Sequence, residues 1–99
     1  MAKFIQIVEF TTTKFDEGSK LVDKFRAATE GKRTTRHAMT GKSRDQENRY
    51  FTIVEFDSYE DAMKNSELPE TGELAAGLTQ LADGPPTFHN LDVVREETD

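Results

Sequence analysis

The sequence predicts a single α+β domain of order βαββαβ with a four-stranded antiparallel sheet. The first observation is a repeat: Phe4–Phe10 returns as Tyr50–Phe56, and the four residues Ile-Val-Glu-Phe are identical in both copies. Both runs are β-branched and aromatic, as strands are, and each is followed by residues of the kind that cap helices. A fainter Thr-x-His-x-(Met/Leu) pattern relates Thr35–Met39 to Thr87–Leu91. The two repeats, in the same order, predict a domain with two related halves.

The composition limits the kinds of partner. The 99 residues form one domain, residues 1–99, and about a third are hydrophobic. A net charge of −6 disfavours binding to nucleic acid or to an anionic membrane. We find neither a membrane-spanning run nor a signal peptide in the sequence. Cysteine is absent, so a disulfide, an iron–sulfur cluster and a thiol nucleophile are excluded, and we expect a cytoplasmic protein.

The first half is predicted as strand, helix, strand. The first strand covers residues 3–11, and Asp16 is the expected N-cap of the following helix. Gly31 is the expected residue that ends this helix, and residues 33–41 form a polar strand at a sheet edge. One apolar helix face is predicted, made of Leu21, Val22, Phe25 and Ala28.

The second half begins with a charged loop over residues 42–48, which we interpret as a solvated connector. After the second Ile-Val-Glu-Phe strand, residues 58–61 form a capping box that starts a short helix. Pro69 interrupts that helix, and Thr71 is expected to cap a second segment. This segment ends at the Gly-Pro-Pro of residues 84–86, and a last strand follows over residues 87–95. The apolar stripe of the second helical segment is expected to be core and consists of Leu74, Ala75, Leu78, Leu81 and Ala82.

The connections place the first and third strands side by side, antiparallel, at the centre of the sheet. Apolar residues occur in both alternating sets of the first strand, Phe4 with Val8 and Ile5 with Ile7. Both faces of the sheet therefore need cover, and the helices can cover only one of them. We predict an obligate homodimer in which the second face is buried.

Three stretches resemble the dimeric α/β-barrel superfamily, in the neighbourhood of the antibiotic-biosynthesis monooxygenases. They are residues 53–62, Ile-Val-Glu-Phe-Asp-Ser-Tyr-Glu-Asp-Ala; the broken helix at residues 65–71; and the strand at residues 87–93. The resemblance covers most of the chain through loose, fold-level motifs. It implies a ferredoxin-like fold and a homodimer in which two sheets face each other, with a small-molecule cavity in each subunit.

The chain departs from that family at the residues that carry chemistry. Haem-degrading members use a Trp with Asn and His, and quinone-forming members also depend on a Trp, whereas this sequence has none. The short helix of the common pattern ends in His, and Asn65 stands at that place here. No catalytic set carries over residue by residue, and we predict no metal and no cofactor.

The two histidines are the candidate catalytic residues. The predicted sheet order places His89 beside Glu9 and His37 beside Glu55, on neighbouring strands about 4.8 Å apart. A glutamate that holds a histidine makes a general base, because the carboxylate fixes the tautomer and raises the imidazole pKa. The alternative is that both pairs are structural and satisfy polar groups in the sheet. A slip of one residue in register would turn either histidine to the other face.

Four further residues are candidate ligand contacts. Phe88 and Asn90 flank His89 and favour the half of the domain with Glu9 as a site for an aromatic ligand. Tyr59 can project a phenol into a cavity, and Arg36 can attract an anion at its mouth.

Two functions remain open. One is a cofactor-independent monooxygenase-like or cyclase-like enzyme acting on an aromatic or polyketide-type compound. The other is a non-catalytic module that binds a ligand or stabilises a partner.

Overall fold

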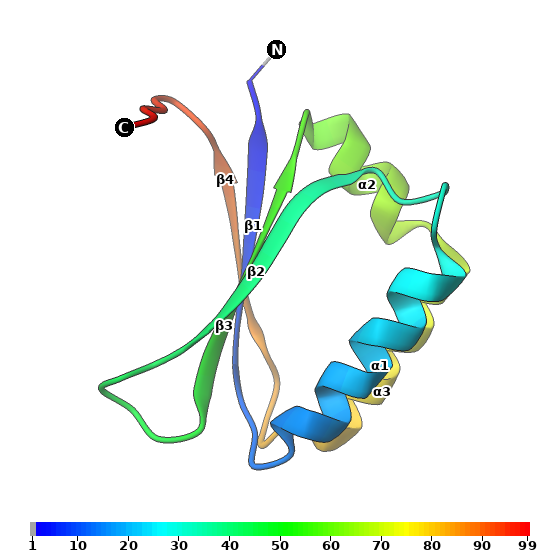
Figure 1. The fold of residues 1–99 in the computed structure, drawn as a ribbon, viewed down its shortest axis with the longest axis vertical. Coiled ribbons are helices and arrows are strands. Elements are labelled where there is room, and N and C mark those ends of the chain that lie inside the picture. Colours follow the sequence, from blue (N-terminus) through cyan, green and yellow to red (C-terminus); the bar gives the residue numbers. More distant parts are fainter. Residues whose placement is uncertain (1) are drawn as a thin grey trace.

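The computed structural model describes residues 2–99, which form one four-stranded antiparallel sheet and three helices (Figure 1). The strand order is β2-β3-β1-β4, so the two Ile-Val-Glu-Phe strands are the central neighbours, as predicted. The elements in chain order are β1 (Phe4–Thr11), α1 (Phe15–Ala28), β2 (Thr35–Lys42), β3 (Arg49–Phe56), α2 (Tyr59–Ser66), α3 (Pro69–Leu81) and β4 (Thr87–Asp92).

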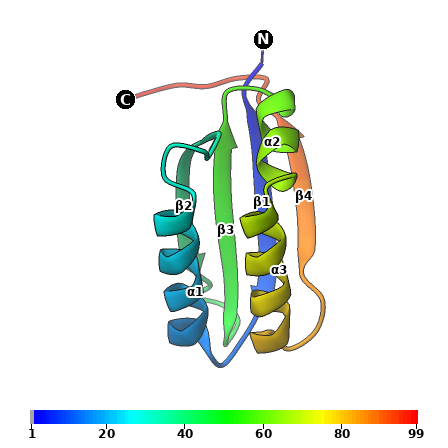
Figure 2. The ribbon, with the colours of Figure 1, turned by 90° about the vertical axis from the view of Figure 1, so that its right-hand side faces the viewer.

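The helices lie on one face of the sheet (Figure 1), and Figure 2 views the sheet from that side. Two aromatic contacts identify that face. The Phe4 ring of β1 meets Tyr59 of α2 edge-on, and the Tyr50 ring of β3 stacks on Phe15 of α1. Side chains alternate along a strand, so the even-numbered residues of β1 and β3 face the helices. We call this the inward face, and the opposite side of the sheet the open face.

The inward face is closed by an aromatic cluster at each end. At one end Phe4 and Phe56 are buried against Ala62, with Val54 beside them. At the other end the Tyr50 ring stacks on Phe10 with centroids 5.6 Å apart and on Phe15 with centroids 4.4 Å apart. These contacts connect the sheet to α2 at one end and to α1 at the other.

Between the two clusters, the space between the inward face of the sheet and the helices is less tightly filled. We call this space and its side chains the inward layer. Val8 and Thr52, which are paired at the middle of the inward face, are only half-buried. Neither α1 nor α3 has a fully buried residue, and the apolar side chains Leu21, Phe25 and Leu78 are also half-buried. A well-packed interior leaves few side chains in this state. The middle of the layer therefore remains partly accessible in a single chain.

The helix starts follow local hydrogen bonding, and two predicted caps are wrong. Asp16 lies inside the first turn of α1, and the Lys14 N–H that precedes the helix donates to the Thr12 hydroxyl instead. Thr71 lies inside α3, because Pro69 already supplies the favoured first position. The capping box is confirmed, since Ser58 Oγ accepts a hydrogen bond from the Asp61 N–H at 3.2 Å.

Two helix and strand ends also differ from prediction. The α1 helix ends at Ala28, and Thr29 caps it with its N–H and its hydroxyl both donating to the Phe25 carbonyl. The chain then leaves the helix through a turn in which Gly31 takes positive φ and the N–H groups of Lys32 and Arg33 donate to the Thr29 carbonyl. Strand β4 ends at Asp92, three residues early. The chain then diverges after a last main-chain bond from Val93 to Lys3.

The α1 and α3 helices cross closely through two glycines. A Cβ at Gly77 would lie 2.9 Å from a Leu21 methyl group, and one at Gly18 would lie 3.3 Å from a Leu78 methyl group. The two helices therefore contact each other side by side over the inward face (Figure 2). Within residues 2–99 no helix has the length and hydropathy needed to cross a membrane.

Candidate functional site

Both predicted Glu–His pairs lie on the open face. Glu9 is paired with Phe51 and His89 with Ile7, all in odd-numbered positions that point away from the helices. His37 is paired directly with Glu55. The register thus gives both histidines the same orientation, toward the side of the sheet that no helix covers.

Glu9 is the centre of a three-residue polar network. Its Oε1 lies 3.3 Å from His89 Nε2, and its Oε2 accepts a hydrogen bond from the Arg49 guanidinium. The hydrogen bond with His89, and then the hydrogen bond and charge of Arg49, hold the pKa of Glu9 below its usual value. The His89 side chain is 46% exposed, whereas that of Glu9 is 22% exposed. The imidazole is accessible, and its carboxylate partner is within hydrogen-bond reach.

The second half of the domain is built differently. A β-bulge between Thr35 and His37 lets Arg36 reach the carboxylate, with its Nε 3.5 Å from Glu55 Oε2. Lys3 Nζ lies 3.9 Å from the other oxygen of Glu55. His37 makes no hydrogen bond with Glu55 among the described residues. The inserted residue of a bulge changes which side chains face a partner, and here an arginine takes the place that a histidine has at Glu9.

Arg36 also pairs with Asp57, whose Oδ1 lies 2.7 Å from its Nη1. This contact, followed by the charges of Asp57 and Glu55, raises the pKa of Arg36 above its usual value. Arg36 is therefore held at the sheet edge by two carboxylates. The guanidinium stays charged, and these two carboxylates compensate its charge.

The remaining predicted ligand contacts lie on the other side of the sheet. Phe88 and Asn90 point to the inward face, where Asn90 Oδ1 accepts a hydrogen bond from Gln6 Nε2 at 3.1 Å. Tyr59 packs its ring edge against Phe4 and is 51% exposed. Because neighbours along a strand face opposite ways, the sheet separates His89 from Phe88 and Asn90. These three residues do not share a single site within one chain.

The open face surrounds its polar network with apolar side chains. Met39 is 55% exposed and Leu91 is 46% exposed, both on edge strands. Ile53, on a central strand, is 36% exposed. Ile5, Ile7 and Phe51 complete the apolar part of this face and are half-buried. This contiguous surface has no cover from residues 2–99.

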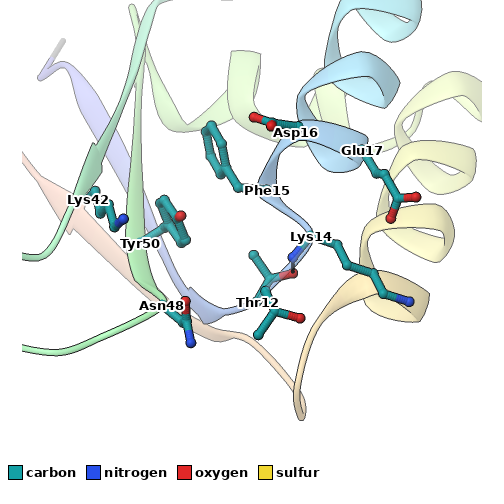
Figure 3. Close-up of a pocket in the computed structure, with 9 residues that line it drawn as sticks. Thr12, Lys14, Phe15, Asp16, Glu17, Lys42, Asn48 and Tyr50 are labelled. Carbon is teal, nitrogen blue, oxygen red and sulfur yellow. Dashed lines mark hydrogen bonds between the residues drawn. The ribbon is translucent and has the colours of Figure 1, made fainter.

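A pocket lies at the end of the molecule where the β1–α1 turn meets the β2–β3 hairpin (Figure 3). Its volume is about 570 Å³. Tyr50 and Lys42 contribute from the inward face of the sheet, and Phe15 contributes from the first turn of α1. The complete lining is Thr12, Thr13, Lys14, Phe15, Asp16, Glu17, Lys42, Asn48 and Tyr50.

Local hydrogen bonds fix the walls of this pocket. The Thr12 hydroxyl donates to the Leu81 carbonyl at 2.7 Å, while the Thr12 N–H donates to the Asn48 carbonyl at 2.9 Å. Asn48 has φ of 61°, a conformation that Asn tolerates better than most residues. The buried Tyr50 ring is stacked on both Phe10 and Phe15. The turn, the hairpin and the aromatic cluster thus form one wall.

The charges in the pocket are balanced, with two lysines, Lys14 and Lys42, and two carboxylates, Asp16 and Glu17. Among residues 2–99, no three His, Asp or Glu side chains are grouped so as to hold a metal ion. Sequence reasoning missed this pocket because its two main segments are about thirty residues apart and each resembles a solvated connector. The sequence did contain one indication of the pocket. The segment that follows β1 and the hairpin between β2 and β3 both adjoin ends of strands that lie side by side in the predicted sheet.

No protein-family model matches the sequence, and no curated protein matches it. Solved structures do match. The cofactor-independent oxygenase SnoaB from Streptomyces nogalater, as a single-residue variant, has a TM-score of 0.83 at 13% identity, with 100% of both chains covered. A proposed antibiotic biosynthesis monooxygenase from Caulobacter crescentus has a TM-score of 0.82 at 14% identity, covering 95% of this chain and 92% of that one. A similar protein from Nitrosomonas europaea has a TM-score of 0.77 at 9% identity, covering 94% and 91%.

The TM-scores establish a shared architecture. At identities this low the chemistry has to be argued from the residues of this chain. The strand order, the single helix-covered face and the broken second helix agree with the resemblance inferred from residues 53–71. The chain has the same ferredoxin-like fold as these solved structures.

Proposed function

We propose that this chain binds a planar aromatic or polyketide-type small molecule between its sheet and its helices, and that it acts as a cofactor-independent oxygenase. The observation that carries the proposal is the inward layer, which has aromatic clusters at both ends and only half-buried residues between them. Ligand sites of this kind are concave and mostly apolar, with a few polar groups. The pocket beside Tyr50 is the proposed entrance.

The chemistry requires a substrate that reduces oxygen by itself. An activated methylene between two aromatic rings loses a proton to give a carbanion, which transfers electrons to O₂. The methylene becomes a carbonyl, and its two hydrogens leave with the second oxygen atom as water. In this proposal a carboxylate at the entrance, Asp16 or Glu17, takes the proton. Lys14 and Lys42 stabilise the delocalised anion by their charge.

The Glu9–His89 pair has a separate place in this proposal. The sheet lies between this pair and the pocket, so the imidazole cannot reach a ligand on the inward side. We propose instead that a second copy of the chain covers the open face and buries the pair in a homodimer. The exposed Met39, Leu91 and Ile53 support this proposal, because contiguous apolar surface of this kind usually marks an interface.

The test uses anthrone, a tricyclic ketone with one activated methylene. We expect the protein to bind anthrone and to consume one O₂ for each anthraquinone formed, with metal chelators present. Lys42→Met should lower kcat by about tenfold or more and leave the melting temperature unchanged. Lys24→Met, on the exposed side of α1, is the matched control and should behave as the native protein.

The outcomes separate the two functions. Anthrone binding without oxygen uptake would support the second candidate, a non-catalytic ligand-binding or partner-stabilising module. The balanced charges of the pocket and the absence of histidine from its lining favour that candidate. No binding of anthrone or of larger tricyclic compounds would overturn the proposal.

A further inference from the structure

Two buried side-chain oxygen atoms lie at the corner between α2 and α3 without a hydrogen-bond donor. They are Asn65 Oδ1 and Glu70 Oε1, and neither has a donor anywhere among residues 2–99. Asn65 is 9% exposed. Most buried polar atoms have a partner, so each exception needs an explanation.

The other buried polar residues are satisfied. The Thr12 hydroxyl donates to the Leu81 carbonyl, the Thr29 hydroxyl donates to the Phe25 carbonyl, and Ser58 Oγ accepts from the Asp61 N–H. Asn65 is thus the one member of this group of four whose side-chain oxygen has no donor. The fold satisfies its structural polar groups, and the exception lies at a single corner.

The corner adjoins the inward layer. Asn65 follows Ala62 by one helical turn on the same side of α2, and Ala62 packs in the cluster with Phe4 and Phe56. The Thr71 hydroxyl donates to the Asn65 main-chain oxygen at 2.6 Å and holds the first turn of α3 against α2. Glu70, the neighbour of Thr71, therefore lies at the same junction as Asn65.

Both atoms are acceptors, and this decides the chemistry that suits them. Glu70 Oε2 is bound to Lys32 Nζ at 2.5 Å, which leaves Oε1 free. The Lys32 bond, followed by the main-chain N–H of Glu70 itself, holds the pKa of Glu70 below its usual value, so the group is a carboxylate at neutral pH. An amide oxygen and a carboxylate oxygen repel an anion and complement an O–H or N–H group.

We infer that the α2–α3 corner is a hydrogen-bond-accepting subsite, in which Asn65 and Glu70 accept from hydroxyl groups on the ring system of the ligand. This inference rests on the proposed function and narrows its substrate class to hydroxylated aromatic compounds. Sites built to bond a hydroxyl reject analogues that lack it, because their own polar groups then stay unpaired. The break in the helix between Asn65 and Thr71 would then position the two acceptor side chains for the ligand.

A matched pair of ligands tests the inference, namely a naphthalenediol and its dimethyl ether, which has the same rings but no donor. Calorimetry should give the native protein a preference of about tenfold or more for the diol. Asn65→Leu, which keeps the side-chain shape, should reduce that preference to about twofold or less. Thr79→Val, on the exposed side of α3, should leave it unchanged. Equal binding of both compounds by the native protein would overturn the subsite and leave the proposed function standing.

A second measurement needs no ligand. Asn65→Leu replaces the amide, with its unpaired buried oxygen, by two methyl groups and should keep or raise the melting temperature. Ser58→Ala, which removes a satisfied cap, should lower it. A fall for Asn65→Leu as large as that for Ser58→Ala would assign Asn65 a structural role and overturn the subsite. Asn65→Ala and Glu70→Gln provide the same ligand comparison if the leucine variant does not fold. Failure of the native protein to bind either compound would count against the proposed function itself.

Discussion

The two faces of the sheet use the same four strands and reach different degrees of closure. On the inward face, Phe56 of β3 is 3% exposed within an aromatic cluster. On the open face, Ile53 of the same strand is 36% exposed beside a network of charged groups. The inward face therefore supplies the stability of the single chain. The open face keeps apolar surface that a single chain does not use.

The comparison also applies within each face. The inward face is tight at its ends and looser in its middle, while the open face has a Glu–His contact in one half and a Glu–Arg contact in the other. The two copies of the Ile-Val-Glu-Phe strand therefore lie in different surroundings. The face on which a side chain lies and the residues beside it, rather than its residue type, determine its contacts.

The largest expected effect is on the inward face. Phe56→Ala should lower the free energy of unfolding by about 3–5 kcal/mol, because it removes a buried ring and leaves a cavity. The matched change on the open face of the same strand, Phe51→Ala, should cost only about 1–2 kcal/mol in a dilute single chain. Urea denaturation of both variants measures the difference. Equal losses would mean that the two faces are buried to the same extent.

The next effect concerns association. Ile53→Asp should convert the proposed homodimer to a monomer, since it places an unpaired carboxylate at the centre of the apolar surface. The helical circular dichroism of the monomer should remain that of the native protein. Sedimentation velocity at micromolar concentration measures the change, and Lys24→Asp on the exposed side of α1 serves as the control. A native protein that already sediments as a folded monomer would contradict the dimer proposal.

A smaller effect distinguishes the two halves of the open face. His89→Ala should cost about 0.5–1 kcal/mol, because it removes one hydrogen bond from an accessible pair. His37→Ala should be close to neutral, since Arg36 and Lys3 already contact Glu55. Thermal unfolding of the two single variants and of the double variant measures the asymmetry. Equal costs would show that the bulge at Arg36 does not separate the halves.

The smallest effect is a dependence on pH. The folded-state pKa of Glu9 is lowered from its ordinary value of 4.5, so its contribution to stability is present above that value. The contribution is lost as the pH falls below 4.5 and passes through the lowered folded-state pKa. His89→Ala should move the Glu9 titration, followed by NMR of its side-chain carboxyl carbon, to higher pH.

The elements and their order were predictable because each depends on short-range pattern. Repeated β-branched runs define the central strands, and the capping box at Ser58 defines the start of α2. The helix start at Phe15 was missed because the decisive bond, from the Lys14 N–H to the Thr12 hydroxyl, is made upstream of Asp16. Sequence preference alone favoured the acidic residue.

The site was less predictable because it depends on register and on loop geometry. The sequence placed Glu9 beside His89, and the structure has them 3.3 Å apart. Side-chain alternation along β4 already implied that Phe88 and Asn90 face the opposite way from His89. The sequence could not reveal the β-bulge that lets Arg36 contact Glu55. The pocket needs the turn at Thr12 to meet the hairpin at Asn48, through a main-chain bond that no side-chain pattern encodes.

The glycine contact between α1 and α3 offers a way to resize the binding layer from a distance. Gly77 touches Leu21 and lies outside the lining of the pocket, yet the helix that it positions carries Phe15. Gly77→Ala forces Leu21 to turn or the two helices to separate, and separation would shift the first turn of α1 against Tyr50. Ligand breadth would then be tuned by helix spacing, with every contacting residue unchanged. A series of two-, three- and four-ring compounds assayed against native protein and Gly77→Ala would measure this as a shift in the preferred ring count.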